Sequence, residues 1–335
     1  MGRSRFAVAL AAILTVLAWS GWSRAQTADR PEPPKSALSQ STLSAEDKTE
    51  IVEALRLKKE AGDQIWPGLA GADIPVVLYN AAYEFLVGDP KPPRPWELVP
   101  GDDFEGRAYF RRAKGDAQSF AVKIGEGWAG SAATLDHMLS RMPLKLGRDF
   151  HAVVVLHEMF HAFQASRAPK RFEQALAVYK SESRYPFQDA EFAADWTEEG
   201  ATLAQALKAA NDALARRLAG KFLEIRRMRR GRSGLAPELV TYERELEWLE
   251  GLAKQAEMRF YETAGARLPF ILQNDFVRLE KQMGAQGGDL RFYLSGMAQA
   301  RLLDRLCPGW QSKTALAALI LEDILSAVVT PKPDE

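Results

Sequence analysis

The sequence predicts an α+β fold, in which a small N-terminal β-sheet precedes a mostly α-helical region. Strand-like runs rich in β-branched and aromatic residues lie at 74–79, 107–112 and 119–124, and the last two are expected to form a hairpin around Lys114-Gly-Asp116. From Arg148 onward, apolar residues recur instead at helical spacing. Helices are expected over about 148–166, 189–209, 211–230, 237–260, 266–283, 290–306 and 312–328.

The first residues have the layout of a secretory signal peptide. The basic start Met1–Arg5 is followed by the apolar stretch Phe6–Trp19 and then by Ser23-Arg-Ala25, a small-x-small cleavage pattern. The apolar stretch is short for a membrane span, and an uncleaved anchor is the alternative. We therefore expect residues 1–25 to be removed and the mature chain to be exported, periplasmic or secreted, with no stable membrane span.

Charge and cysteine content narrow the class of protein. Lys plus Arg and Asp plus Glu number 44 each, so no net field attracts nucleic acid or anionic lipid, and neither is expected as a partner. The lone Cys307 excludes an intramolecular disulfide. An exported chain without disulfides suits a bacterial periplasm better than a small secreted toxin.

Three regions are expected after the signal peptide. Residues 26–43, rich in Pro, Ser and charge, predict a disordered linker. Residues 44–146 predict a mixed α/β region that begins with a helix from Ser44 to about Ala61, and residues 147–330 predict a helical catalytic region. Within the mixed region, Lys123–Gly130 is interpreted as a glycine-rich turn, with an edge for peptide strand addition as the alternative.

The most informative stretch is His157-Glu158-Met159-Phe160-His161. Histidines four residues apart project from the same face of a helix, one turn apart, which lets two imidazoles bind one Zn²⁺. Glu158 lies about 100° round the helix axis from His157, where it could take a proton from a zinc-bound water. The alternative is a structural helix whose two histidines happen to have this spacing, but an unpartnered glutamate in such an apolar run would be costly.

A catalytic zinc takes three protein ligands and a water, so another ligand is needed. His137 and His151 do not lie in a recognisable ligand setting. Glu199, in Trp196-Thr-Glu-Glu-Gly-Ala201, and Glu250, in Leu246-Glu-Trp-Leu-Glu-Gly-Leu-Ala253, both fall in apolar helical stripes where a solvated carboxylate is unexpected. Either carboxylate could complete the site.

These motifs together resemble those of the gluzincin metallopeptidases, the thermolysin-like and zinc aminopeptidase group. The resemblance implies a zincin-like catalytic domain with Glu250, the acid before Gly-Leu-Ala, as the third zinc ligand and Glu257 as a later acid. Phe292-Tyr-Leu-Ser-Gly296 is similar to the aminopeptidases' Tyr-x-x-Gly helix, which implies that Tyr293 stabilises the oxyanion. The aminopeptidases' Gly-x-Met-Glu-Asn loop has no counterpart here, so their specificity is not implied.

We therefore expect an exported zinc-dependent metallopeptidase that hydrolyses a peptide or protein substrate through a zinc-bound water activated by Glu158. The alternative is a catalytically inactive zincin-fold binding or interaction protein of the cell envelope. The basic cluster Arg226-Arg-Met-Arg-Arg230 with Arg232 is interpreted as a solvated helix end, and an anionic-ligand patch is the alternative.

Overall fold

A computed structural model describes residues 40–115, 118–141, 148–263 and 270–330, and it confirms the α+β class. The predicted signal peptide and residues 26–39 of the predicted linker lie outside the described residues. The chain forms two compact units. Unit 1 comprises the described residues up to Ser166 together with Thr263, and unit 2 comprises the others.

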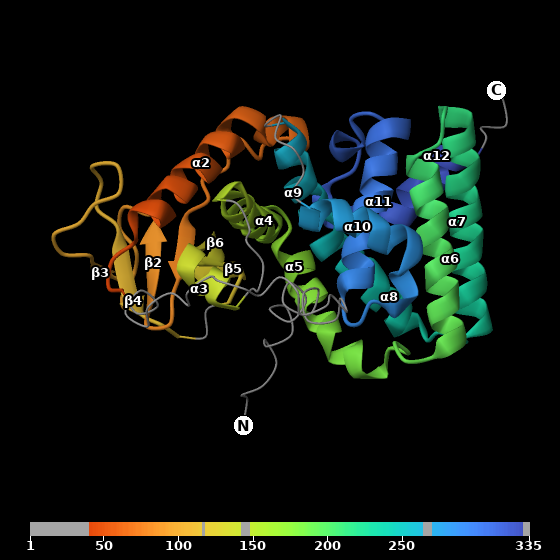
Figure 1. Ribbon diagram of the computed structural model, residues 1–335, viewed down its shortest axis with the longest axis horizontal. Helices are drawn as coiled ribbons and strands as arrows, with labels where there is room; N and C mark the ends of the chain where they lie inside the picture. Colours follow the sequence, from red (N-terminus) through yellow and green to blue (C-terminus); the bar gives the residue numbers. More distant parts are fainter. Residues whose placement is uncertain (1–39, 116–117, 142–147, 264–269, 331–335) are drawn as a thin grey trace, which may run out of the picture. The chain divides into compact units, whose positions relative to one another are not determined.

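Unit 1 is built on a six-stranded sheet with the strand order β3-β4-β2-β1-β6-β5 (Figure 1). β1 and β6 are parallel, with Val76 opposite Gly130, and the other neighbouring pairs are antiparallel. The strands are β1 Val76–Tyr79, β2 Tyr83–Val87, β3 Glu97–Leu98, β4 Phe110–Ala113, β5 Phe120–Ile124 and β6 Gly127–Ala133.

The predicted hairpin between 107–112 and 119–124 is wrong. Both segments contain strands, but β4 pairs with β2 and β3, whereas β5 pairs with β6. The hairpin partner of β5 is the second half of Lys123–Gly130, which turns at Gly125, where φ is 58°. β6 is then an interior strand, so the edge of the sheet on this side is β5 and not the glycine-rich segment itself.

The helices of unit 1 are α2 Ala45–Ile65, α3 Leu135–Arg141 and α4 Arg148–Arg167. The predicted start of α2 is confirmed, because the Ser44 hydroxyl caps the helix by accepting the backbone N–H of Asp47 at 3.0 Å. α2 and α4 contact each other through Trp66 and Phe160, whose rings meet edge to face with centroids 5.7 Å apart. α4 therefore packs within unit 1.

The helix with the two histidines packs on the sheet within unit 1, because its backbone lies directly on β6 at Gly130. The opposite face of the sheet carries its own apolar cluster, closed by Trp96 from the proline-rich loop. The cluster consists of Val77, Leu86, Trp96, Ile124 and Ala129, with Phe110 and Val122 packed against it.

The end of the predicted linker is ordered on unit 1. Leu43 is buried, and its backbone N–H donates to the hydroxyl of Tyr109 at 3.1 Å. The Gln40 carbonyl accepts a hydrogen bond from the side-chain amide of Asn80 at 2.7 Å, and the Ser41 carbonyl accepts one from Arg111. The anchored part of the chain thus begins before residue 44.

Unit 2 is helical, and α6 and α7 run side by side in it (Figure 1). The predicted helix 237–260 is found as α8 and α9 joined by a π-helical turn at Glu247–Gly251. In the described part of the chain, no helix combines the length and apolarity needed to cross a membrane. The helices are α5 Pro169–Ala177, α6 Ala190–Leu207, α7 Asp212–Arg232, α8 Pro237–Leu246, α9 Leu252–Thr263, α10 Phe270–Lys281, α11 Leu290–Leu306 and α12 Leu321–Val329, with 3₁₀ turns at Val178–Arg184, Met283–Ala285, Trp310–Ser312 and Leu316–Ala318.

Candidate metal site

Helix α4 brings His157, Glu158 and His161 together in unit 1. Each offers one ligand atom, and these atoms all lie within 4.8 Å of one another. The two imidazole rings have centroids 4.9 Å apart and an interplanar angle of 75°. All three side chains are buried, with exposed fractions of 4%, 2% and 1%. The sequence spacing thus produces the expected cluster of two imidazoles and one carboxylate.

Gln164 orients the second histidine of this cluster. His161 Nδ1 lies 3.0 Å from the Gln164 side-chain oxygen, one turn further along α4. Because that oxygen can only accept, the proton is on Nδ1, and Nε2 carries the lone pair that a metal would need. Phe120 of β5 packs against the same imidazole, with ring centroids 4.5 Å apart. The histidine is therefore fixed in both tautomer and orientation.

Glu158 is close to a tyrosine that the sequence analysis did not single out. Burial and the negative charge of Glu158 raise the pKa of Tyr79 at the end of β1, partly offset by a hydrogen bond with Ser119 at 3.2 Å. The phenol is therefore neutral at physiological pH. A carboxyl group beside a neutral hydroxyl suits a site that exchanges protons with substrate and solvent.

Gly130 of β6 sets the distance between the sheet and the motif. A Cβ atom added to Gly130 would lie 2.6 Å from the backbone nitrogen of Met159 and 2.8 Å from the carbonyl carbon of Glu158. These are backbone atoms of the motif itself, so a side chain at this position would push the helix away. Among the amino acids, only glycine allows so close an approach without displacement.

In unit 2, Glu250 and Tyr293 lie around a common partner, Tyr179. The Tyr179 hydroxyl is 3.2 Å from Glu250 Oε1 and 2.9 Å from Asp289 Oδ2. Burial, the charges of Asp289 and Glu250, and the nearby Tyr293 all raise the pKa of Tyr179. Burial and then the charge of Glu250 raise the pKa of Asp289 to about 7. Two of the predicted site residues thus share one buried polar cluster.

Glu250 also lies in an unusual stretch of backbone. It belongs to the π-helical turn Glu247–Gly251, a local widening that recurs at functional sites. The turn packs tightly on α11, since a Cβ added to Gly251 would lie 2.5 Å from the Cα of Gly296. Glu247, three residues before Glu250, accepts hydrogen bonds from Arg226 at 2.6 and 3.0 Å. The π-turn therefore places two acids in different polar networks.

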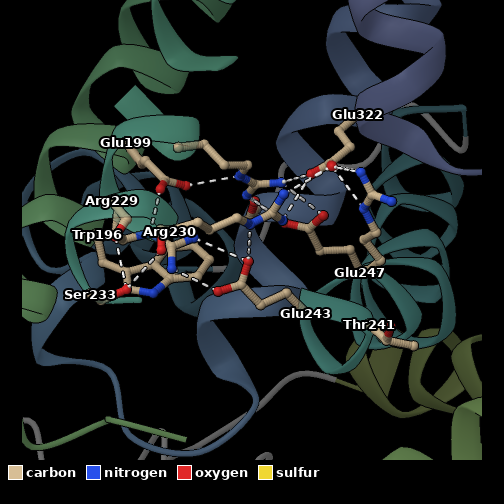
Figure 2. Close-up of polar contacts among 12 residues, drawn as sticks. Trp196, Glu199, Arg229, Arg230, Ser233, Thr241, Glu243, Glu247 and Glu322 are labelled. Atoms are coloured by element: carbon tan, nitrogen blue, oxygen red, sulfur yellow. Dashed lines mark hydrogen bonds and ion pairs between the residues drawn. The ribbon is translucent and has the colours of Figure 1, made fainter. Parts of the chain in front are cut away.

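Glu199, the other candidate ligand, belongs to a buried ionic network in unit 2 (Figure 2). Its Oε2 accepts from Arg226 at 3.0 Å, and its Oε1 accepts from Arg229 at 2.5 Å. Figure 2 shows Arg229 between Glu199 and Glu243. Both oxygens of Glu199 are therefore neutralised by guanidinium groups, and a metal would have to displace those two charge-assisted bonds.

The same network corrects the interpretation of the arginine-rich segment as a solvated helix end. Arg226 and Arg229 are buried, because acids from other helices meet them inside unit 2. Burial by itself would raise the pKa of Glu243, but Arg229 and Arg230 outweigh it and lower that pKa to about 2. The network joins Arg226, Arg229, Arg230 and Arg244 to Glu199, Glu243, Glu247 and Glu322.

The remaining acids and histidines considered from the sequence have other partners or places. Glu257 forms an ion pair with Lys254 at 3.1 Å, and Lys254 also pairs with Asp275 at 2.7 Å. His151 Nε2 contacts the Ala133 carbonyl at 2.7 Å. His137 packs edge-on against Tyr79, and burial first and then nearby cations lower its pKa to about 4. Neither histidine joins the cluster of His157 and His161.

Several residues around these sites were missed from the sequence. A signal existed for Gln164, which lies one helical turn after His161, and for Gly130, a glycine within a strand, which often marks a close backbone approach. Tyr79, Tyr179 and Asp289 come from distant segments, so no local pattern predicts their positions.

Comparison with known proteins identifies no relative: no protein-family model, no curated protein and no solved structure matches the chain.

Proposed function

We propose that the chain is an exported zinc-dependent metallopeptidase of gluzincin-like type. The observation that carries the proposal is the buried cluster of His157, Glu158 and His161, whose ligand atoms lie within 4.8 Å of one another. Zn²⁺ prefers imidazole nitrogens, and ligating histidines characteristically donate their other ring N–H to a fixed acceptor. His161 has such an acceptor in Gln164. The donor set therefore fits zinc.

Glu250 is the proposed third protein ligand. The resemblance of Trp248-Leu-Glu-Gly-Leu-Ala253 to the gluzincin motif favours it. Glu199, the other candidate ligand, is less suited, because each of its carboxylate oxygens already accepts a hydrogen bond from an arginine. Glu250 interacts instead with a neutral phenol and with Asp289, whose raised pKa indicates a site where negative charge accumulates. A carboxylate in such a site gains most from a cation.

Each residue then has a distinct role in hydrolysis. A metal bound by His157 and His161 would polarise the scissile carbonyl and lower the pKa of water. Glu158 would take up the proton of the attacking water and deliver it to the leaving amine. Tyr293 would donate a hydrogen bond to the oxygen on which negative charge develops. Glu158 needs no covalent bond to substrate in this scheme.

The sheet supports an extended peptide as the substrate. β5 is the terminal strand of the sheet, and its Phe120 packs against His161. Peptides commonly bind by adding a strand to such an edge, where main-chain hydrogen bonds align them. An extended segment beside β5 would place its backbone near the catalytic helix, and the proposal therefore favours peptide bonds over other hydrolysable bonds.

The test compares Glu158→Gln with Glu126→Gln, a control at the exposed turn between β5 and β6. With a quenched fluorescent peptide library and added zinc, wild type and the control should hydrolyse peptides equally. Glu158→Gln should keep its zinc and its fold but lose about 10²–10⁴-fold in kcat, because only the base is removed. Equal turnover in all three proteins would contradict the assignment of Glu158. Zinc binding without turnover by wild type would indicate the inactive binding protein instead.

A further inference from the structure

Basic side chains of unit 1 gather around Tyr79, the last residue of β1. The ammonium group of Lys114 lies 4.9 Å from the centre of the Tyr79 ring. The His137 ring meets the same phenol edge to face, with centroids 5.8 Å apart. Arg141 follows His137 by four residues on α3, so the two side chains project from the same face of that helix. We call Lys114, His137 and Arg141 the basic patch.

The electrostatics of these groups agree with their placement. Burial, followed by Arg141 and Lys114, lowers the pKa of His137 to about 4. Burial and Glu158 raise the pKa of Tyr79, and Arg141 is close enough to oppose them. The His137 imidazole is therefore neutral at physiological pH, with one N–H donor and one lone pair, and it lies in a positive field. Tyr79 lies close both to the basic patch and to the acid of the motif.

Two members of the basic patch have polar groups that no described residue satisfies. Both ring nitrogens of His137 are buried without a hydrogen-bond partner, whereas buried polar groups in proteins normally have one. Arg141 is exposed, and it forms no ion pair within the described part of the chain. In the arginine network of unit 2, by contrast, each guanidinium meets at least one carboxylate. Arg141 is therefore available to an anion from solution.

The start of β5 links the basic patch to the two histidines. The hydroxyl of Tyr79 lies 3.2 Å from that of Ser119, the residue directly before β5. The next residue, Phe120, packs against His161 with ring centroids 4.5 Å apart. An extended peptide advances about 3.3–3.6 Å per residue, so one short peptide beside this segment can contact both the motif and the basic patch.

We propose that Lys114 and Arg141 bind a carboxylate of the substrate close to the peptide bond that is cut, with the N–H of His137 as a further donor. The inference rests on the proposed function and deepens it, because it names a group that the substrate must carry. A guanidinium and an ammonium are the side-chain groups that pair best with a carboxylate. That carboxylate is either the free C-terminus of a peptide or an acidic side chain, and the test distinguishes the two.

Binding is measured without turnover, by calorimetric titration of the zinc-loaded mature chain carrying Glu158→Gln. One pair of probes is N-acetyl-phenylalanyl-alanine and its C-terminal amide. The other pair is the C-terminal amides of N-acetyl-phenylalanyl-aspartate and N-acetyl-phenylalanyl-asparagine. The carboxylate member of at least one pair should bind about 10–100-fold more tightly than its neutral partner. A preference in the first pair identifies the chain end, and one in the second identifies the side chain. Equal affinity, or no detectable binding, in both pairs would overturn the inference.

Variants of the basic patch locate the carboxylate. In the Glu158→Gln background, Arg141→Gln and Lys114→Gln should each remove most of the preference for the carboxylate and leave the affinity for the neutral probe unchanged. Arg107→Gln is the matched control, because it removes an exposed arginine elsewhere in unit 1, and it should keep the full preference. Thermal unfolding checks that each variant is folded. A preference that survives in Arg141→Gln and Lys114→Gln would overturn the assignment of the basic patch.

Turnover by wild type separates the inference from the function on which it rests. If zinc-loaded wild type hydrolyses peptides but the binding assay shows no preference for a carboxylate, only the inference is overturned. If the preference is present and is lost in Arg141→Gln, but wild type hydrolyses no peptide, the peptidase function is overturned and the carboxylate site stands.

Discussion

Replacing Gly130 by alanine tests whether the approach of β6 to the motif controls the metal site. The added Cβ would lie 2.6 Å from Met159 N, so α4 must move by roughly 0.8 Å to restore ordinary van der Waals separation. The obstructing atoms are backbone, and no side-chain rotation relieves the clash. Overpacking of this kind costs about 2–3 kcal/mol, which lowers Tm by about 4–12 °C. The ligands of a metal site tolerate displacements of only about 0.5 Å from their productive geometry, so the zinc affinity of Gly130→Ala should fall at least tenfold.

Gly127→Ala is the control for this experiment. Gly127 lies in the same strand, but the nearest atom to its added Cβ is the Ile124 carbonyl oxygen at 3.7 Å, an ordinary contact. Calorimetry and chelator competition on the two variants should show a loss of stability and zinc affinity in Gly130→Ala and no loss in Gly127→Ala. If Gly130→Ala retained wild-type Tm and zinc affinity, the idea that this contact places the motif would be refuted.

Three further outcomes are expected. Arg229→Met should lower the free energy of unfolding by about 3–5 kcal/mol, because Glu199 and Glu243 would lose a buried cation. Urea unfolding measures this change, and a loss below about 1 kcal/mol would show that the network contributes little to stability. The folded-state pKa of Glu243 is about 2, below the unfolded value near 4.5, so its stabilisation is present above pH 4.5 and lost as pH falls toward 2. Urea unfolding from pH 6 to 2 should show the free energy of unfolding fall with pH in the wild type and fall less steeply in Glu243→Gln. An equal dependence on pH in both proteins would assign the loss of stability to other groups. N-terminal sequencing of protein extracted from the cell envelope should begin at or near Gln26, and retention of Met1 would reject cleavage.

Most of the long helices were predictable because their apolar periodicity is local, but α3 and α5 were not predicted, and α12 begins at Leu321 and not at the predicted residue 312. The Ser44 cap of α2 and the apolar run of α4 are both visible in the sequence, and both are found in the structure. Strand pairing was not predictable to the same degree. The sequence of β6 is Gly-Trp-Ala-Gly-Ser-Ala-Ala, which lacks the β-branched residues typical of strands. Its small residues are explained by the tertiary packing, because the backbone of α4 lies directly against Gly130.

The candidate site could likewise be predicted only in part from the sequence. The i, i+4 spacing of His157 and His161 specifies their proximity on any helix, so this part followed from sequence. The buried arginines could not be anticipated, because Arg226 and Arg229 are neutralised by acids 14 to 96 positions away. Sequence patterning treats such charges as solvated, and only the tertiary fold shows that they are paired.

The most direct test is the zinc content of the purified mature chain, measured by atomic emission after dialysis against trace metal. Wild type is expected to retain about one zinc per chain, and His161→Ala should retain almost none, because one of the two imidazoles is lost. His137→Phe provides the control, since it removes a buried imidazole outside the cluster and should keep its zinc. A wild-type protein without zinc, or equal zinc in wild type and His161→Ala, would contradict the assignment of this helix as a metal site.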